Sequence, residues 1–482
     1  MEKNVRTGKT PLYVAMWRWH FYAGVVVLPL MLLLSVTGMI YLFKAEFEEW
    51  WYRDLLTVQP GTHRMPAERL VEIARAAHPD KSVMGYSPAA NAQASARVLL
   101  GPKRKPAGEH ADHDGAAPRK TTVFNTPPSA FERPVEVYLD PYRGTVLGTL
   151  YPEDRPMQVV RNLHGKLLAG TTGELIVETA SGWMAMLLVS GIYLWWPRTG
   201  NWVWGTLLPR LSDKRRTFWK DMHAVPAFYT TVLLVFILAT GLPWTVVAGG
   251  AIKLASGSSR EGPAEARADR FHSQPIASHS GSVQDWFASF PEALGTRLRS
   301  IPPAKPGQLS LEHVAVIAEA NGLPHPFQIA SPRGPQGVYS VRTLPRDPRQ
   351  TMFLHVDQYS GEIRGSFAFD SMNPVAKTVS MGIALHEGRL FGFWNQMLGV
   401  LACLGTFTLS IAAGVMWWQR RPEGRLGAPR MMRSFQLPRG IVALSAGMSV
   451  IFPVTGLSLL SVLVFDRWIL PRFPRLRWVL AE

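Results

Sequence analysis

The stretch Trp17–Gly38, WRWHFYAGVVVLPLMLLLSVTG, joins a histidine to a long apolar run that ends in a Thr-Gly pair. Thr37-Gly38 begins 17 residues after His20. The same spacing recurs later in the chain, where Thr240-Gly241 begins 17 residues after His223. An apolar run of this length predicts a helix that crosses a membrane, because about 20 residues span a hydrocarbon core of about 30 Å.

A second signature also occurs twice. Trp195-Trp196 begins 31 residues after His164, and Trp417-Trp418 begins 31 residues after His386. Two different signatures that each recur at an unchanged internal spacing indicate that the chain is internally duplicated. The tryptophan pairs themselves are typical of the aromatic belt at a membrane surface.

The chain has 482 residues, of which 47% are hydrophobic, and the apolar residues collect in long runs. These runs predict a mainly α membrane protein with about five transmembrane helices. The first run follows basic residues, as in a signal peptide. Its apolar part is longer than the about 7–15 residues of a signal and no A-x-A site follows, so we expect it to be retained. The predicted helices are 20–43, 174–196, 224–247, 394–418 and 440–465.

The two long polar segments, 44–160 and 248–385, also resemble each other. Glu136–Gly144 (EVYLDPYRG) and Phe353–Gly361 (FLHVDQYSG) both alternate apolar and polar residues before an Asp-x-x-x-Gly turn, as a strand that enters a hairpin does. The central aspartates are therefore predicted to be turn residues. Each segment is predicted to be a small α+β domain, and the first contains an insert at 101–127 that is predicted to be a disordered loop.

Lys and Arg residues concentrate in the N-terminus and in two short loops. The positive-inside rule places these segments in the cytoplasm and the long polar segments outside. The net charge of +16 is thereby explained by lipid contact, and we expect no nucleic-acid partner. Five helices place the C-terminal tail outside, although it carries four arginines. The predicted order is N-terminus and first helix 1–43, outer domain 44–160, second helix 161–197, loop 198–222, third helix 223–247, outer domain 248–385, fourth helix 386–418, loop 419–439, fifth helix 440–465 and tail 466–482.

This topology decides which histidines can share a metal ion. His20 and His223 lie at cytoplasmic helix ends and form an inner pair, whereas His164 and His386 lie at outer helix ends and form an outer pair. Most of a bilayer of about 30 Å separates the two levels. Two opposed imidazoles from facing helices suit an iron porphyrin, whereas zinc prefers three or four clustered ligands. We therefore expect two haem groups, each held by one pair.

The remaining composition narrows the kind of haem. The single cysteine, Cys403, excludes an internal disulfide and a Cys-rich iron–sulfur or zinc site. No C-x-x-C-H motif occurs, so the haem would be bound non-covalently, as haem b. Basic residues two or three positions from each histidine are candidate partners for haem propionates, although such residues also serve as interface anchors. These residues are Arg18, Lys220, Lys166 and Arg389.

The first signature occurs once more, in part, near the C-terminus. Thr455-Gly456 follows the pattern of the earlier Thr-Gly pairs, but the residue 17 positions before it is Pro438. The third copy has therefore lost its ligand position, and we expect two metal sites. The Thr-Gly pairs are interpreted as helix packing points, since small residues let helices approach closely.

Taken with these patterns, the chain resembles the PepSY-associated transmembrane family, which includes the inner-membrane siderophore-iron reductases of Gram-negative bacteria, such as the ferrioxamine-type reductases. The resemblance extends over nearly the whole chain. It implies a bacterial inner-membrane protein with periplasmic PepSY-like domains and two haem b groups, which passes electrons to a ferric siderophore and so releases the iron. The residues that carry it are WRWH at 17–20, LHG at 163–165, DMH at 221–223, LHEGRLFG at 385–392 and the two Asp-x-x-x-Gly modules.

No G-x-G-x-x-G or P-loop motif occurs, so electrons would come from a separate cytoplasmic donor, such as a flavin or NAD(P)H reductase. Two other functions stay open. A siderophore or metal permease without redox chemistry would need polar groups in the middle of the membrane, and the apolar runs contain few. A regulatory protein whose PepSY-like domains bind peptides would explain the outer domains but not the matched histidines.

Overall fold

The computed structural model describes residues 11–103, 133–197, 203–210, 215–259, 262–263, 267–273, 287, 290–303, 307–427, 439–469 and 472–473. Most of the predicted loop at 101–127 lies outside these residues. The chain divides into two compact units. The helical unit comprises residues 1–43, 160–255 and 382–482, and the sheet unit comprises residues 44–159 and 256–381.

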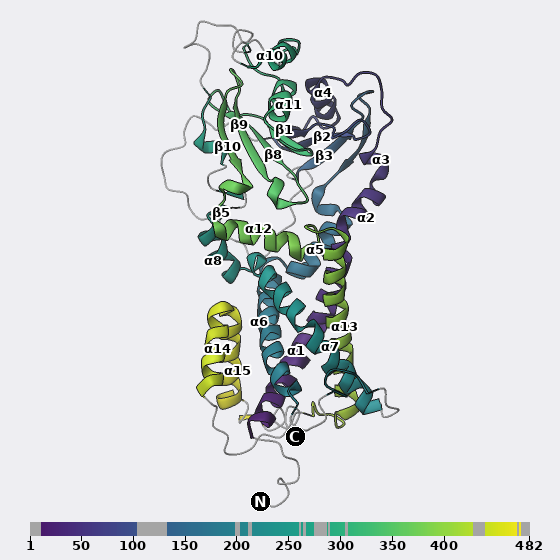
Figure 1. Cartoon of the computed structure of the whole chain (residues 1–482), viewed down its shortest axis with the longest axis vertical. Helices are drawn as coiled ribbons and strands as arrows, with labels where there is room; N and C mark the ends of the chain where they lie inside the picture. Colours follow the sequence, from purple (N-terminus) through teal and green to yellow (C-terminus); the bar gives the residue numbers. More distant parts are fainter. Residues whose placement is uncertain are drawn as a thin grey trace, which may run out of the picture. The chain divides into compact units, whose positions relative to one another are not determined.

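The helical unit contains four long apolar helices, α1 (Pro11–Leu42), α6 (Gly170–Trp195), α7 (Arg215–Gly241) and α13 (Phe393–Arg420). Each is long and apolar enough to cross a membrane, which confirms four of the predicted spans. Helix α13 packs against both α7 and α1, and α1 packs against α6 (Figure 1). Small residues allow this close packing, because a Cβ on Gly405 would lie 2.5 Å from the Thr230 side chain.

The fifth predicted helix, 440–465, differs in the structure. It forms two short helices, α14 (Arg439–Ile451) and α15 (Pro453–Val464), followed by a π-helical turn at Phe465–Ile469. Phe452 lies between them with non-helical φ and ψ of −121° and 77°, as expected of a residue before proline. Helices of 13 and 12 residues extend only about 20 Å each, less than the about 30 Å of a hydrocarbon core.

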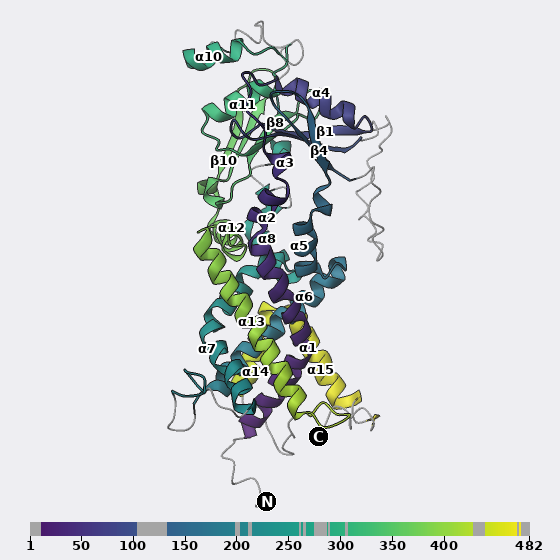
Figure 2. The ribbon, with the colours of Figure 1, turned by 90° about the vertical axis from the view of Figure 1, so that its right-hand side faces the viewer.

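The chain reverses direction between α14 and α15, where Gly456 packs against Ser449 (Figure 2). Helix α15 then runs parallel to α6, because the Thr455 hydroxyl donates to the Thr179 carbonyl and Trp183 Nε1 donates to Ser458 Oγ. The end of α15 therefore lies toward the Trp195 end of α6, where the first basic loop begins. A single helix would have placed the tail 466–482 at the opposite end.

Both outer histidines lie on short helices that precede the membrane spans, which the sequence had placed on the spans themselves. His164 is near the end of α5 (Pro156–Lys166), and His386 is the last residue of α12 (Pro374–His386). Left-handed backbone separates these helices from the spans, at φ of 48° and 55° in Leu167 and Leu168 and at φ of 71° in Gly388.

The sheet unit is built around one antiparallel sheet of eight strands in the order β10-β9-β8-β7-β1-β2-β3-β4. Each half of the chain supplies four strands, and the halves meet where Tyr86 of β1 pairs with Ile329 of β7. The two repeats predicted at 44–160 and 248–385 thus share one sheet, which leaves neither β1 nor β7 as an open edge. The strands are β1 (Lys81–Ser87), β2 (Ala96–Pro102), β3 (Val135–Leu139), β4 (Val146–Leu150), β7 (Phe327–Ala330), β8 (Val338–Thr343), β9 (Met352–Asp357) and β10 (Ile363–Ala368).

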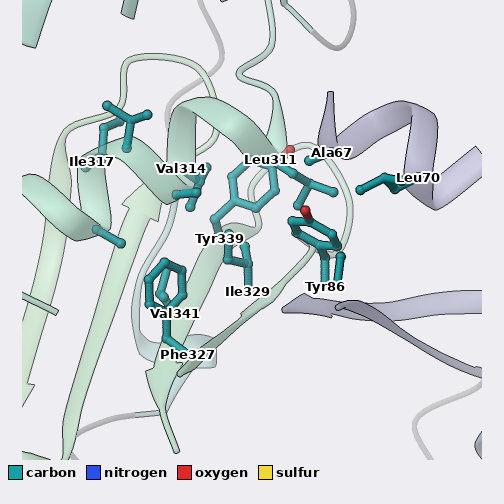
Figure 3. Packing of buried hydrophobic residues seen from close by; sticks show 14 of the residues in the cluster. Ala67, Leu70, Tyr86, Leu311, Val314, Ile317, Phe327, Ile329, Tyr339 and Val341 are labelled. Carbon is teal, nitrogen blue, oxygen red and sulfur yellow. The ribbon is translucent and has the colours of Figure 1, made fainter. Parts of the chain in front are cut away.

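One helix from each half, α4 (Ala67–Ala77) and α11 (Leu311–Ala320), contributes to a hydrophobic core that the two repeats share (Figure 3). The two helices also cap each other. The Glu68 carboxylate accepts from Leu311 N at 2.5 Å, and the Glu312 carboxylate accepts from the backbone of Ala67. Burial raises the pKa of Glu68, and burial together with the nearby Glu68 raises the pKa of Glu312.

The predicted aspartate turns are confirmed. Asp140 Oδ1 accepts from Tyr142 N at 2.8 Å, and Asp357 Oδ1 accepts from Tyr359 N at 2.9 Å. The glycines that end the two turns have φ of 67° and 77°, which glycine adopts without strain.

Short elements complete the described residues. They are α2 (Lys44–Trp51), α3 (Arg53–Leu56), α8 (Val247–Ser256), α10 (Glu292–Arg299), β5 (Ser258–Ser259), β6 (Gly262–Pro263), and the 3-10 turns Pro152–Asp154, Leu242–Trp244, Ala268–Arg270, Pro348–Gln350 and Phe369–Ser371.

Candidate functional site

The structure brings the inner pair together. His20 on α1 and His223 on α7 have ring centres 6.2 Å apart and ring planes at 84°. Two metal–nitrogen bonds of about 2 Å, plus about 1 Å from each nitrogen to its ring centre, require a separation of about 6 Å. The spacing between these imidazoles therefore matches a single metal ion held between them.

The outer pair also lies close together. Burial lowers the pKa of His164 to about 4, and the neighbouring His386 lowers that pKa further. Burial likewise lowers the pKa of His386 to about 4. The Trp244 ring lies 5.3 Å from the His386 ring and covers one side of it. Both outer imidazoles are therefore neutral near pH 7, the form in which a histidine binds a metal ion.

Threonines from the Thr-Gly pairs hold the outer histidines. Thr37 Oγ1 lies 2.9 Å from His164 Nδ1, and Thr240 Oγ1 lies 3.0 Å from His386 Nδ1. Each threonine hydroxyl also donates to a carbonyl of its own helix, at 2.7 Å in α1 and 2.8 Å in α7. A hydroxyl has one proton, so each threonine accepts from the imidazole, and Nδ1 carries the hydrogen.

The inner histidines have the same tautomer through different partners. His20 Nδ1 lies 2.9 Å from Ser190 Oγ, and the Ser190 hydroxyl donates to the Met186 carbonyl at 2.8 Å. His223 Nδ1 lies 2.9 Å from the Leu409 carbonyl, which can only accept. In all four histidines Nδ1 is thus a donor, and the lone pair of Nε2 is left for a ligand. Metal-binding histidines are oriented in this way.

Glycines leave space beside three of the four rings. A Cβ on Gly38, Gly191 or Gly241 would lie 3.1, 3.3 or 3.4 Å from Cε1 of the adjacent histidine, which is tighter than ordinary packing. The Thr-Gly pairs therefore do more than pack helices, because the threonine orients an imidazole and the glycine gives it room. The sequence contained a signal for this role. A helix of 17 residues rises about 25 Å, which places each threonine at the opposite membrane level from the histidine on its own helix.

The donor set fits a haem. Each pair offers two imidazoles, and no group of three or more His, Cys, Asp or Glu residues that could hold a metal ion occurs in the described part of the chain. Two ligands suit a metal whose other positions belong to a macrocycle and do not suit zinc. All four histidines also remain partly accessible, so their surroundings leave surface that a bound group could cover.

The four basic neighbours differ in their surroundings. Lys166 forms an ion pair with Glu174 at 2.7 Å, and Arg389 forms one with Glu387 at 2.6 Å. The Arg18 guanidinium lies 5.2 Å from the Tyr22 ring centre, and Lys220 is exposed. The propionate role of Lys166 and Arg389 would therefore compete with an existing carboxylate partner.

Three further contacts near the histidines were not predicted. Buried Asp221, two residues before His223, accepts from Arg210 N and Nη2 at 2.8 Å. Fully buried Glu178 accepts from Val246 N at 2.9 Å and from the next two backbone amides at 3.2 and 3.3 Å. This carboxylate fixes the segment that follows Trp244. The sequence gives no local signal for these pairs, because their partners lie 11 and 68 residues away.

The first tryptophan of each Trp-Trp pair ties a helix end to the loop that follows it. Trp195 Nε1 donates to the Thr206 carbonyl and Trp417 Nε1 donates to the Leu426 carbonyl, both at 3.0 Å. The fixed spacing from histidine to tryptophan thus joins an outer histidine to an anchored loop at the inner end.

Comparison with known proteins agrees with the duplicated histidine pattern. The family described as the PepSY-associated TM region matches residues 17–420, which include all four histidines and end at the last residue of α13. No curated protein sequence matches the chain.

Proposed function

This chain belongs to the family of the PepSY-associated TM region, and from that premise we propose that it is a di-haem b oxidoreductase of the bacterial inner membrane. It would take electrons from a cytoplasmic donor, a flavin or NAD(P)H reductase, and deliver them to a periplasmic ferric siderophore. Each Fe(III) gains one electron and becomes Fe(II), which binds the hard oxygen ligands of the chelate more weakly and is released.

The observation that carries the proposal is the common state of the four imidazoles. They form two pairs, each with one histidine from each half of the chain, and every Nδ1 is held as a donor. His20 and His223 would hold the inner haem, and His164 and His386 the outer one. When bound, the haems supply one-electron chemistry, while the chain sets their position and surroundings.

The direction of transfer rests on charge. The N-terminus and the two short loops are rich in Lys and Arg, which the positive-inside rule places in the cytoplasm. The sheet unit would then lie in the periplasm, where the siderophore docks. The acceptor class rests on the resemblance to siderophore-iron reductases, which the LHEGRLFG stretch at 385–392 carries.

The first experiment is a reduced-minus-oxidised absorption spectrum of the purified chain, with haem quantified per chain. We expect two low-spin b-type haems. His386→Ala and His20→Ala should each remove one of them while the protein still inserts. His63→Ala, at an exposed histidine of the sheet unit, is the matched control and should keep both.

Activity is tested separately, as oxidation of the reduced protein by a ferric trihydroxamate chelate in proteoliposomes. His386→Ala should abolish this oxidation. A colourless wild-type protein would overturn the proposal and favour a permease or a regulatory protein. Two haems without oxidation by ferric chelates would keep electron transfer and reject the siderophore as acceptor.

A further inference from the structure

We propose that Thr37 and Thr240 are positioning residues for the outer haem, although each lies on a helix that supplies a ligand to the inner haem. The inference rests on the proposed haem function and deepens it. Helix α1 carries His20 toward one end and Thr37 toward the other, and α7 carries His223 and Thr240 in the same way.

The geometry supports an accepting role for both hydroxyls. The oxygen–nitrogen distances to the outer histidines are 2.9 and 3.0 Å, and the hydroxyl protons are committed to helix carbonyls at 2.7 and 2.8 Å. Thr37 is 4% exposed, so water is poorly placed to substitute for its hydroxyl. The same arrangement in both halves shows that it depends on the repeated Thr-Gly pair and not on one local contact.

The chemical effect follows from the direction of the hydrogen bond. An imidazole that donates from Nδ1 becomes a more basic ligand at Nε2. A more basic ligand stabilises Fe(III) relative to Fe(II) and therefore lowers the midpoint potential. Thr37 and Thr240 would thus lower the potential of the outer haem and fix the rotation of both its ligands.

The chain provides its own contrast for this role. Thr231 lies on α7 and its hydroxyl donates to the Ala227 carbonyl at 2.6 Å, as the positioning threonines do to their own helix. Thr455, in the third Thr-Gly copy, donates to the Thr179 carbonyl of α6. Neither of these hydroxyls has an imidazole partner among the described residues, so both are controls for the loss of a helix hydroxyl alone.

The test is redox potentiometry and electron paramagnetic resonance of the full chain with its haems bound. The outer signal is first assigned as the one that His386→Ala removes. Thr37→Val and Thr240→Val should each raise the midpoint potential of the outer haem and shift its resonance. They should also speed transfer of that haem to a scavenger protein by about 10-fold or more. Thr37→Ser should restore the wild-type values, whereas Thr231→Val should change neither haem.

The assignment to the outer haem is the sharpest part of the prediction. Ser190→Ala should move the inner haem instead, because Ser190 Oγ lies 2.9 Å from His20 Nδ1. A shift of the inner haem by Thr37→Val, or equal effects of Thr37→Val and Thr231→Val, would overturn the inference and leave the two-haem function standing. A wild-type chain without haem would overturn both.

Discussion

The two halves of the chain hold their histidines in one tautomer with partly different chemistry. In the outer pair the acceptors match, since Thr37 and Thr240 lie 2.9 and 3.0 Å from the imidazoles. In the inner pair they differ, since His20 uses the Ser190 hydroxyl and His223 uses the Leu409 carbonyl. The requirement is therefore a donating Nδ1, and either a hydroxyl or a backbone carbonyl can meet it.

The halves also differ in how the chain leaves the outer histidines. The second half uses glycines, Gly388 and Gly392, at φ of 71° and 55°. The first half forces Leu167 and Leu168 into φ of 48° and 55° before Gly170. Left-handed backbone costs a non-glycine residue about 1–2 kcal/mol, so the first half stores strain that the second half lacks.

Glu178→Ala tests a support that only the second half uses, and it should have the largest effect. The change leaves three backbone amides without their carboxylate acceptor, which we expect to lower the free energy of unfolding by about 3 kcal/mol. Unfolding of the full chain in mixed micelles measures this loss. Glu174→Ala, one turn earlier on α6, removes only a partly exposed ion pair with Lys166 and should cost less than about 1 kcal/mol. Equal losses would show that the amides find other acceptors.

The pH dependence of stability tests a feature that the halves share. Because burial raises the folded-state pKa of Glu68 and Glu312, the folded protein binds these protons more tightly than the unfolded chain does. Their contribution is fully present below the unfolded pKa of about 4.3 and is lost as the pH rises through the raised folded pKa.

Calorimetry of the full chain over this range should show that Glu68→Gln and Glu312→Gln each reduce the loss of stability with rising pH. Glu72→Gln, at an exposed residue of α4, is the control. A single responding variant would show that the reciprocal caps are not equivalent. An unchanged slope in both would contradict the role of these carboxylates.

Leu168→Gly tests the strained linker of the first half, with the smallest effect. Glycine adopts φ of 55° without strain, and Leu168 is 61% exposed, so little buried surface is lost. We expect a gain of about 1 kcal/mol, reduced by the greater freedom of glycine in the unfolded chain. The change is measured as a shift in the unfolding midpoint. A loss of stability would mean that the leucine side chain contributes more than its backbone costs.

Much of this arrangement could be predicted from sequence. Hydropathy located four spans, the Asp-x-x-x-Gly pattern located both turns, and topology paired His20 with His223. The break at Phe452-Pro453 was missed because membrane helices tolerate proline, so an apolar run does not reveal a reversal. The partners of Glu178 and Asp221 were missed because such contacts depend on how the helices pack.

The spacing of 17 residues from histidine to threonine has a consequence for angle as well as for height. Each residue of an α-helix turns the chain by about 100°, so His20 and Thr37 keep a fixed phase around the axis of α1. Deleting one residue between them would shorten the rod by only about 1.5 Å but would rotate one group about 100° away from its partner. The lipid-facing positions between the two levels can therefore vary in identity, while their number is set by the helical screw.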